Sequence, residues 1–223
     1  MFDLRNIRTI PEAFQIYTDL GFRPVPIHGH SLGCKCPDNG ECYDQCLGKV
    51  PIPDHWPDNG PYILRDFVES GNIGLAMGKQ PTGEWFVGLD IDGELDLSKF
   101  FDLPQTLTAK TTRGYHLIYK VPRQTPLGNW NDILMTRSKT LGYKSNYKGA
   151  LDLKYARGIL VAPPSITGTT ENGFKRKWLN NLMPVELPRE VIHFFIRKRK
   201  KAYPNVKYYR RWSDFPSHKN QKP

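Results

Sequence analysis

The run WFVGLDID, residues 85–92, decides the fold of this chain. Side chains of a β-strand alternate between two faces, so Asp90 and Asp92 share one face and the apolar residues between them share the other. Neighbouring carboxylates repel each other unless a proton or a divalent cation neutralises them. Carboxylate oxygens suit hard cations such as Mg²⁺ or Mn²⁺. The alternative is a surface strand whose Asp-Gly end only marks a turn.

A second polar cluster follows in the chain. Residues 105–110 and 115–120 have strand-like patterns, and the turn between them contains Arg113 and Gly114. His116 comes directly after this turn, so we expect it at the mouth of a sheet rather than in a loop. Guanidinium groups suit phosphate oxygens, and glycine lets backbone N–H groups approach an anion closely. A histidine with only a structural role is the alternative.

The third cluster is LDLK at residues 151–154, followed by a turn and an apolar strand that ends in Pro-Pro-Ser. Apolar neighbours on both sides predict at least partial burial of Asp152. A buried, ionised carboxylate needs a partner. Lys154 on the same face is one candidate, and a metal ion shared with Asp90 and Asp92 is the other. An ordinary surface ion pair between Asp152 and Lys154 is the alternative.

Taken in order, these segments resemble the primase-polymerase (prim-pol) domain of the archaeo-eukaryotic primase superfamily. The resemblance covers residues 10 to 180 and is carried by four segments, at 72–78, 88–93, 108–116 and 151–165. It implies an α+β fold in which a mixed β-sheet forms an RRM-like palm. Flanking helices and a small Cys-rich zinc loop complete the expected architecture.

The resemblance also implies roles for the acidic residues and the histidine. Asp90, Asp92 and Asp152 look like the metal-binding carboxylates of the family, which would hold Mg²⁺ or Mn²⁺. His116 looks like a contact to the incoming triphosphate. Together these four residues form the expected catalytic set.

Further residues resemble the family's nucleotide-binding positions. Arg113 and Gly114 flank the histidine, and Lys154 lies where the family usually has a basic residue. Lys49 belongs to a Gly-Lys-x-Pro stretch that lies near the nucleotide site in relatives. Ser165 belongs to the Pro-Pro-Ser signature. We expect all five to contact the nucleotide or to lie beside it.

The function implied is that of a template-dependent DNA primase or polymerase, a nucleotidyltransferase. It would use two divalent metal ions to join nucleoside triphosphates to a 3′-hydroxyl. The expected partners are a DNA template and primer, dNTPs or NTPs, and further domains of a longer protein. A metal-dependent nuclease or phosphohydrolase could use the same three acids, but it would not need Arg113 and His116 to hold a triphosphate. A non-catalytic nucleic-acid binding module is the third possibility.

The cysteines form one tight cluster in the pattern C-x-C-x₅-C-x₃-C. They are Cys34, Cys36, Cys42 and Cys46. Four thiolates in an intracellular protein favour a closed structural Zn²⁺ site over two disulfides, which remain the alternative. His28 and His30 are alternative ligands if one cysteine is spare. Relatives in the family carry a Cys-containing insert at this place, before Gly-Lys-x-Pro.

The positive charge is concentrated at the C-terminal end. The net charge is +10, and residues 197–223 contain ten Lys or Arg residues but one acidic residue. Aromatic residues are interleaved with these cations, which suits phosphate contacts together with base stacking. We therefore expect nucleic-acid contacts from Arg197, Lys198, Arg199 and Lys200. A solvated terminus, or a helix leading into a further domain, is the alternative.

The length of 223 residues predicts one or at most two domains. We place the prim-pol catalytic domain at 1–190, including a zinc-binding loop at 28–50, and a basic helix and tail at 191–223. No segment approaches the ~20 apolar residues of a membrane span. The polar start lacks a signal-peptide core, so we expect a cytoplasmic protein with no membrane partner.

A coarse secondary-structure prediction completes the picture. Periodic apolar residues predict helices at 11–20, 60–70 and 188–200. Short strands dominate the middle of the chain. Residues 121–149 contain several Pro and Gly residues and are predicted to form a loop.

Overall fold

The computed structural model describes residues 3–30, 47–53, 55–56, 58–93, 95–123, 125–128, 130–137, 147–168 and 173–202. Its helices are η1 (Leu4–Asn6), α1 (Ile10–Asp19), α2 (Leu64–Val68), η3 (Leu97–Lys99) and α3 (Arg189–Ala202). Its strands are β1 (Pro24–His28), β2 (Gly71–Ala76), β3 (Gly78–Lys79), β4 (Trp85–Gly93), β5 (Leu107–Lys110), β6 (Gly114–Val121), β7 (Trp130–Arg137), β8 (Tyr147–Lys154), β9 (Ile159–Val161), β10 (Ile166–Thr167), β11 (Phe174–Lys175) and β12 (Lys177–Trp178). The fold is α+β, as the sequence predicts.

A large sheet forms the centre of the molecule. In the described part of the chain its strand order is β12-β5-β6-β4-β8-β7, and β3 pairs with β4. The pairings between these strands are antiparallel. The expected mixture of strand directions is confined, among the described residues, to an isolated parallel bridge between Lys120 and Glu186. Strand β4, which carries the two aspartates, lies between β6 and β8 and is therefore fixed from both sides.

The two faces of β4 serve different purposes. Val87, Leu89 and Ile91 are buried in an apolar cluster with residues of β6 and β8. On the opposite face Phe86 is buried in a second cluster, while Asp90 and Asp92 follow on that same face towards the end of the strand. The alternation expected for this run is thus present, and the acids lie beyond Phe86, towards the end of one face.

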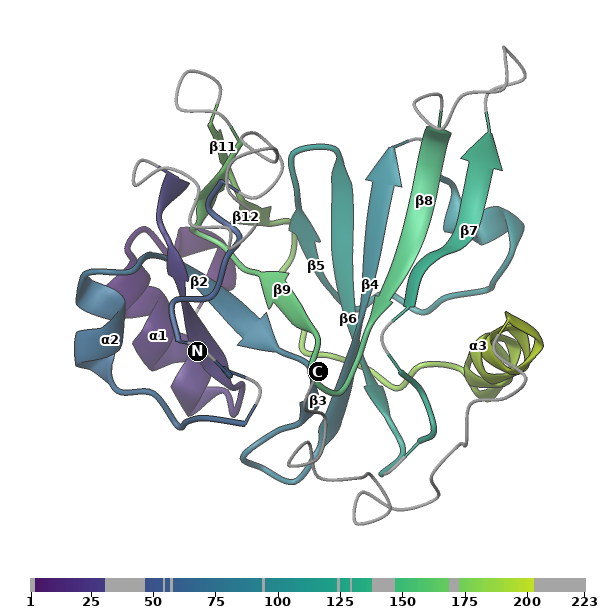
Figure 1. Ribbon diagram of the computed structural model, residues 1–223, viewed down its shortest axis with the longest axis horizontal. Coiled ribbons are helices and arrows are strands. Elements are labelled where there is room, and N and C mark those ends of the chain that lie inside the picture. Colours follow the sequence, from purple (N-terminus) through teal and green to yellow (C-terminus); the bar gives the residue numbers. More distant parts are fainter. Residues whose placement is uncertain are drawn as a thin grey trace, which may run out of the picture.

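The N-terminal part of the chain covers the start of the acidic face. Helix α1 begins at the N-cap Thr9, whose side chain forms a capping box with Glu12, and it ends before Gly21, which has a positive φ of 79°. Strands β1, β2 and β9 form a small antiparallel sheet beside it. Figure 1 shows α1 and α2 on one side of the large sheet and α3 on the other. Phe14 and Tyr17 of α1 pack in the same cluster as Phe86.

Helix α3 packs against the other face of the large sheet. Its residues Val191, Ile192 and Phe195 are buried in the cluster that contains Leu89 and Ile91. The boundary placed between residues 190 and 191 therefore falls inside a helix that belongs to this core. No helix among the described residues has the length and apolar character needed to cross a bilayer.

Most of the predicted elements are confirmed, with one clear error. Helix α1 and the β5–β6 hairpin lie where the sequence places them, and α3 begins one residue later than predicted. Helix α2 is shorter than the predicted 60–70. The predicted loop at 121–149 is wrong, because it contains β7 and the start of β8, which pair with each other. The proline and glycine residues suggested a loop, but pairing between β7 and β8 determines the structure of the middle of that segment.

Candidate active site

Three of the expected catalytic residues lie in one row across three strands. Asp90 is the direct neighbour of His116 on β6 and of Asp152 on β8. Directly opposed residues of an antiparallel pair have Cβ atoms about 5 Å apart on the same face. Asp92 follows two residues along β4, again on this face. The structure therefore places side chains from three separate segments of the sequence on one face of the sheet.

The central contact joins Asp90 to His116. The imidazole Nε2 lies 3.2 Å from Asp90 Oδ1, and both side chains are largely buried. Burial raises the pKa of Asp90, but His116, Lys154 and Arg176 together outweigh it and lower that pKa to about 2. Asp90 is therefore a carboxylate at neutral pH, held by surrounding positive charge.

The same imidazole nitrogen has a second neighbour. Arg176 Nη1 lies 3.3 Å from His116 Nε2. Burial lowers the pKa of His116, and Arg176 lowers it further, while Asp90 and Asp92 act in the opposite direction. A neutral imidazole carries one N–H, so Nε2 either donates to Asp90 or accepts from Arg176, but not both.

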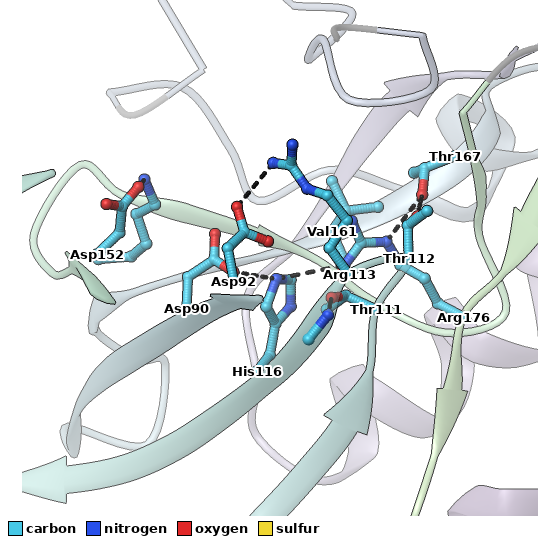
Figure 2. Close-up of polar contacts among 12 residues, drawn as sticks. Asp90, Asp92, Thr111, Thr112, Arg113, His116, Asp152, Val161, Thr167 and Arg176 are labelled. Carbon is cyan, nitrogen blue, oxygen red and sulfur yellow. Dashed lines mark hydrogen bonds and ion pairs between the residues drawn. The ribbon is translucent and has the colours of Figure 1, made fainter. Parts of the chain in front are cut away.

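Asp92 is paired with the turn of the β5–β6 hairpin. Arg113 Nη2 donates to Asp92 Oδ2 at 2.7 Å, and both side chains are substantially exposed. Figure 2 shows Arg113 above Asp92, with Asp90 beside it. The guanidinium therefore lies at the mouth of the site, where exchange of one anionic partner for another needs little rearrangement.

Asp152 lies apart from the other two acids. Lys154 Nζ donates to Asp152 Oδ2 at 2.9 Å, and Figure 2 shows Asp152 at a distance from Asp90 and Asp92. Within the described ranges, no three His, Cys, Asp or Glu side chains form a group arranged to hold a metal ion. The three acids share a face of the sheet, and Asp152 must turn away from Lys154 to join the others.

A cavity of about 200 Å³ opens beside the β4 acids. It is lined by Lys49, Asp90, Asp92, Thr111, Thr112, Arg113, His116, Lys154, Ile159, Leu160, Val161 and Arg176. Four of these side chains are Lys or Arg and two are Asp, so the lining carries an excess of positive charge. Such a cavity favours an anion, above all one that brings its own cations.

Lys49 reaches this cavity from a distant part of the chain. Burial lowers the pKa of Lys49, and the nearby charges of Arg176 and Arg113 lower it further. Asn72 holds the loop in place, because its side-chain amide donates to Gly48 O at 2.9 Å and to Ile166 O at 2.7 Å. Lys49 therefore lines the same cavity as Asp90 and Asp92, and its contact with a nucleotide stays a prediction.

Two of the residues expected to contact the nucleotide, Gly114 and Ser165, instead make contacts that support the backbone. The N–H of Gly114 donates to Thr111 Oγ1 at 2.9 Å, and a Cβ at Gly114 would collide with the carbonyl oxygen of Ile91. The glycine is needed for close approach of two strands, and its N–H is already used. Ser165 is fully buried. Its hydroxyl accepts a hydrogen bond from the N–H of Ile73 at 2.9 Å and donates one to the carbonyl oxygen of Ile73 at 3.0 Å. It does not line the cavity.

Sequence reasoning did not identify Arg176. This residue links β11 to β12 in the sequence. It is buried and lines the cavity together with the acids. In the run Phe174 to Trp178, the alternate residues Phe174, Arg176 and Trp178 are the more buried ones, while Lys175 and Lys177 are exposed. An arginine at a buried position of an alternating strand is the signal that could have revealed it.

Some predicted residues cannot be compared with the structure. The zinc ligands Cys34, Cys36, Cys42 and Cys46 lie outside the described residues, as do the side chains of Arg199 and Lys200. Arg197 and Lys198 are exposed on α3. That helix packs against the face opposite the cavity, so these cations do not line it.

Comparison with known proteins gives one family match. Residues 15–190 match the family model Prim-Pol, described as the N-terminal region of bifunctional DNA primase/polymerase. A search among curated proteins found no match. The matched segment includes the whole site, from Lys49 to Arg176.

Proposed function

This chain belongs to the Prim-Pol family, and from that premise we propose that it is a template-dependent DNA primase or polymerase. It joins nucleoside triphosphates to a 3′-hydroxyl on a DNA template. The observation that carries the proposal is the row His116–Asp90–Asp152 beside a positively charged cavity. We take the sheet that bears this row to be the palm expected from the resemblance to the family.

The donor atoms of the site fit Mg²⁺ or Mn²⁺. Asp90 is ionised, Asp92 points to the same side two residues later, and Asp152 lies opposite Asp90 on the next strand. These three residues would hold two divalent ions, which would stabilise the negative charge on the attacking hydroxyl and on the leaving pyrophosphate.

The cations of the site are proposed to exchange their partners. Arg113 and Lys154 neutralise Asp92 and Asp152 in the present structure. When those carboxylates serve as metal ligands, Arg113 and Lys154 turn to phosphate oxygens of the nucleotide, for which guanidinium and ammonium groups are suited. His116 lies between the acids and the nucleotide and completes the phosphate contacts. Lys49, which also lines the cavity, adds a further positive charge.

Two further parts of the chain have proposed roles outside the site. Zinc bound by the four clustered cysteines would order the loop that precedes Lys49. The exposed Arg197 and Lys198, with Arg199 and Lys200, would contact the DNA backbone.

A primer-extension and de novo priming assay tests the proposal. Labelled dNTPs and NTPs are supplied separately with Mg²⁺ or Mn²⁺, and the wild type is compared with Asp90→Ala and Asp92→Ala proteins. Extension by the wild type and its loss in both variants is the expected result. Cleavage of nucleic acid without incorporation would identify a nuclease instead. Binding without turnover in either metal would identify a non-catalytic module.

A further inference from the structure

Arg176 is a buried cation whose contacts are to neutral groups. Its side chain is 6% exposed, and burial lowers its pKa to about 10, so that it remains charged at neutral pH. Among the described residues, no carboxylate lies within ion-pair distance of its guanidinium. Asp90 and Asp92 attract the guanidinium only beyond ion-pair distance and offset part of the effect of burial on its pKa. Burial of a charge that lacks a direct ion pair is costly, and an anion bound in the cavity would relieve that cost.

The contacts of Arg176 hold it in one orientation. Nε donates to Thr167 Oγ1 at 3.3 Å, and Nη1 lies 3.4 Å from Val161 O and 3.3 Å from His116 Nε2. Among the described residues, Nη2 of Arg176 makes no hydrogen bond. Figure 2 shows Arg176 entering the site from the side of Thr167, opposite Asp152. Nε and Nη1 are thus both engaged, and Arg176 lines the cavity together with the acids.

Arg176 belongs to a group of cations that act on each other. Its charge lowers the pKa of Lys49, as does that of Arg113. Three positive charges gathered around one small cavity destabilise each other unless an anion binds among them. Asp90 and Asp92 offset part of this charge, and metal ions on those acids would restore the excess.

We propose that Arg176 is a further phosphate-binding residue, which contacts the triphosphate of the incoming nucleotide next to His116. This inference rests on the function proposed above. A nucleotide rather than the DNA backbone is the ligand, because the guanidinium is buried inside a cavity of about 200 Å³ together with the acids that hold the metal ions. A DNA strand, in contrast, binds along open surfaces.

Three variants test this assignment. Arg176→Gln removes the charge, Arg176→Lys keeps the charge but loses the planar fork, and Lys177→Ala removes an exposed charge from the next residue as the matched control. We measure KM and kcat for dNTP at saturating primer–template, the affinity for primer–template, and thermal stability. Arg176→Gln should raise KM by about tenfold or more, as expected for loss of a charged hydrogen bond. Arg176→Lys should raise it less, and Lys177→Ala should leave it within about twofold.

The outcomes separate this proposal from others. If Arg176→Gln does not fold, Arg176→Lys decides. An unchanged KM in a folded Arg176 variant overturns the assignment, and so does a change confined to primer–template affinity. If the wild type extends no primer, the proposed function fails, and calorimetry with inorganic tripolyphosphate still tests Arg176. The wild type should then bind this probe at least about tenfold more tightly than Arg176→Gln, and equal binding overturns the proposal.

Discussion

Replacing Asp90 with asparagine should destabilise the folded protein at pH 7 by about 2 kcal/mol. The pKa of Asp90 falls from 3.8 to about 2 in the folded state. Each pKa unit corresponds to about 1.4 kcal/mol of interaction that favours the charged form. Asparagine keeps the shape of the side chain but loses its attraction to His116, Lys154 and Arg176. If the acids of the site mainly repelled each other, Asp90→Asn would instead raise the free energy of unfolding.

The effect has a defined dependence on pH. A carboxylate whose folded-state pKa is lowered adds stability above its unfolded pKa of 3.8 and loses that contribution as the pH falls towards about 2. The advantage of wild type over Asp90→Asn should be full at pH 7 and pH 5 and should fall to about half by pH 3. Urea denaturation in metal-free buffer, followed by tryptophan fluorescence at these three pH values, measures it.

The same variant should lose at least about 10²-fold in primer-extension rate, as loss of a preorganised electrostatic element typically does. Asp102→Asn is the matched control, because Asp102 is an exposed carboxylate on the same chain. It should change neither stability nor rate. Equal or greater stability of Asp90→Asn at pH 7 would refute the electrostatic reasoning. Primer extension near the wild-type rate with Mn²⁺ would refute the catalytic assignment.

Three further substitutions test other parts of the site. Gly114→Ala should lower the free energy of unfolding, measured by urea denaturation, by about 3 kcal/mol, because the new Cβ would collide with the backbone of β4. Gly83→Ala is the comparison: its Cβ would meet no atom within 4 Å, but the positive φ of Gly83 should still cost about 1 kcal/mol. Ser165→Ala should cost about 1–3 kcal/mol by leaving a buried backbone N–H without its acceptor, and kcat and KM should stay unchanged well below the melting temperature. A raised KM would instead return the serine to the nucleotide site. Arg113→Ala should raise KM for dNTP by about tenfold without loss of stability, since its side chain is 68% exposed; an unchanged KM would exclude phosphate binding.

The alternation of side chains along single strands could be read from the sequence. The run 85–92 placed both acids on one face, and LDLK placed Asp152 and Lys154 together; both relations hold in the structure. Pairing between strands could not be read in the same way, because it depends on contacts between distant segments. The direct opposition of Asp90 to both His116 and Asp152 is a result of the sheet order.

Short motifs predicted the roles of single residues less well than alternation predicted which face of a strand a residue occupies. Gly114 and Ser165 stand in the expected stretches, yet each is required for packing of the backbone rather than for a free contact to a ligand. No role was predicted for Arg176, although its alternation with exposed lysines indicates burial. Lys49 could be placed only by resemblance, since Asn72 fixes its loop through contacts that no local pattern contains.

The position of β4 between two partners limits which changes of length the chain can accept. Deletion of one residue from its middle would reverse inside and outside for the rest of the strand. Leu89 or Ile91 would then face the cavity, and carboxylates would enter the apolar cluster beneath α3. Insertions and deletions compatible with activity should therefore occur in the connections between strands, while β4 itself keeps a constant number of residues.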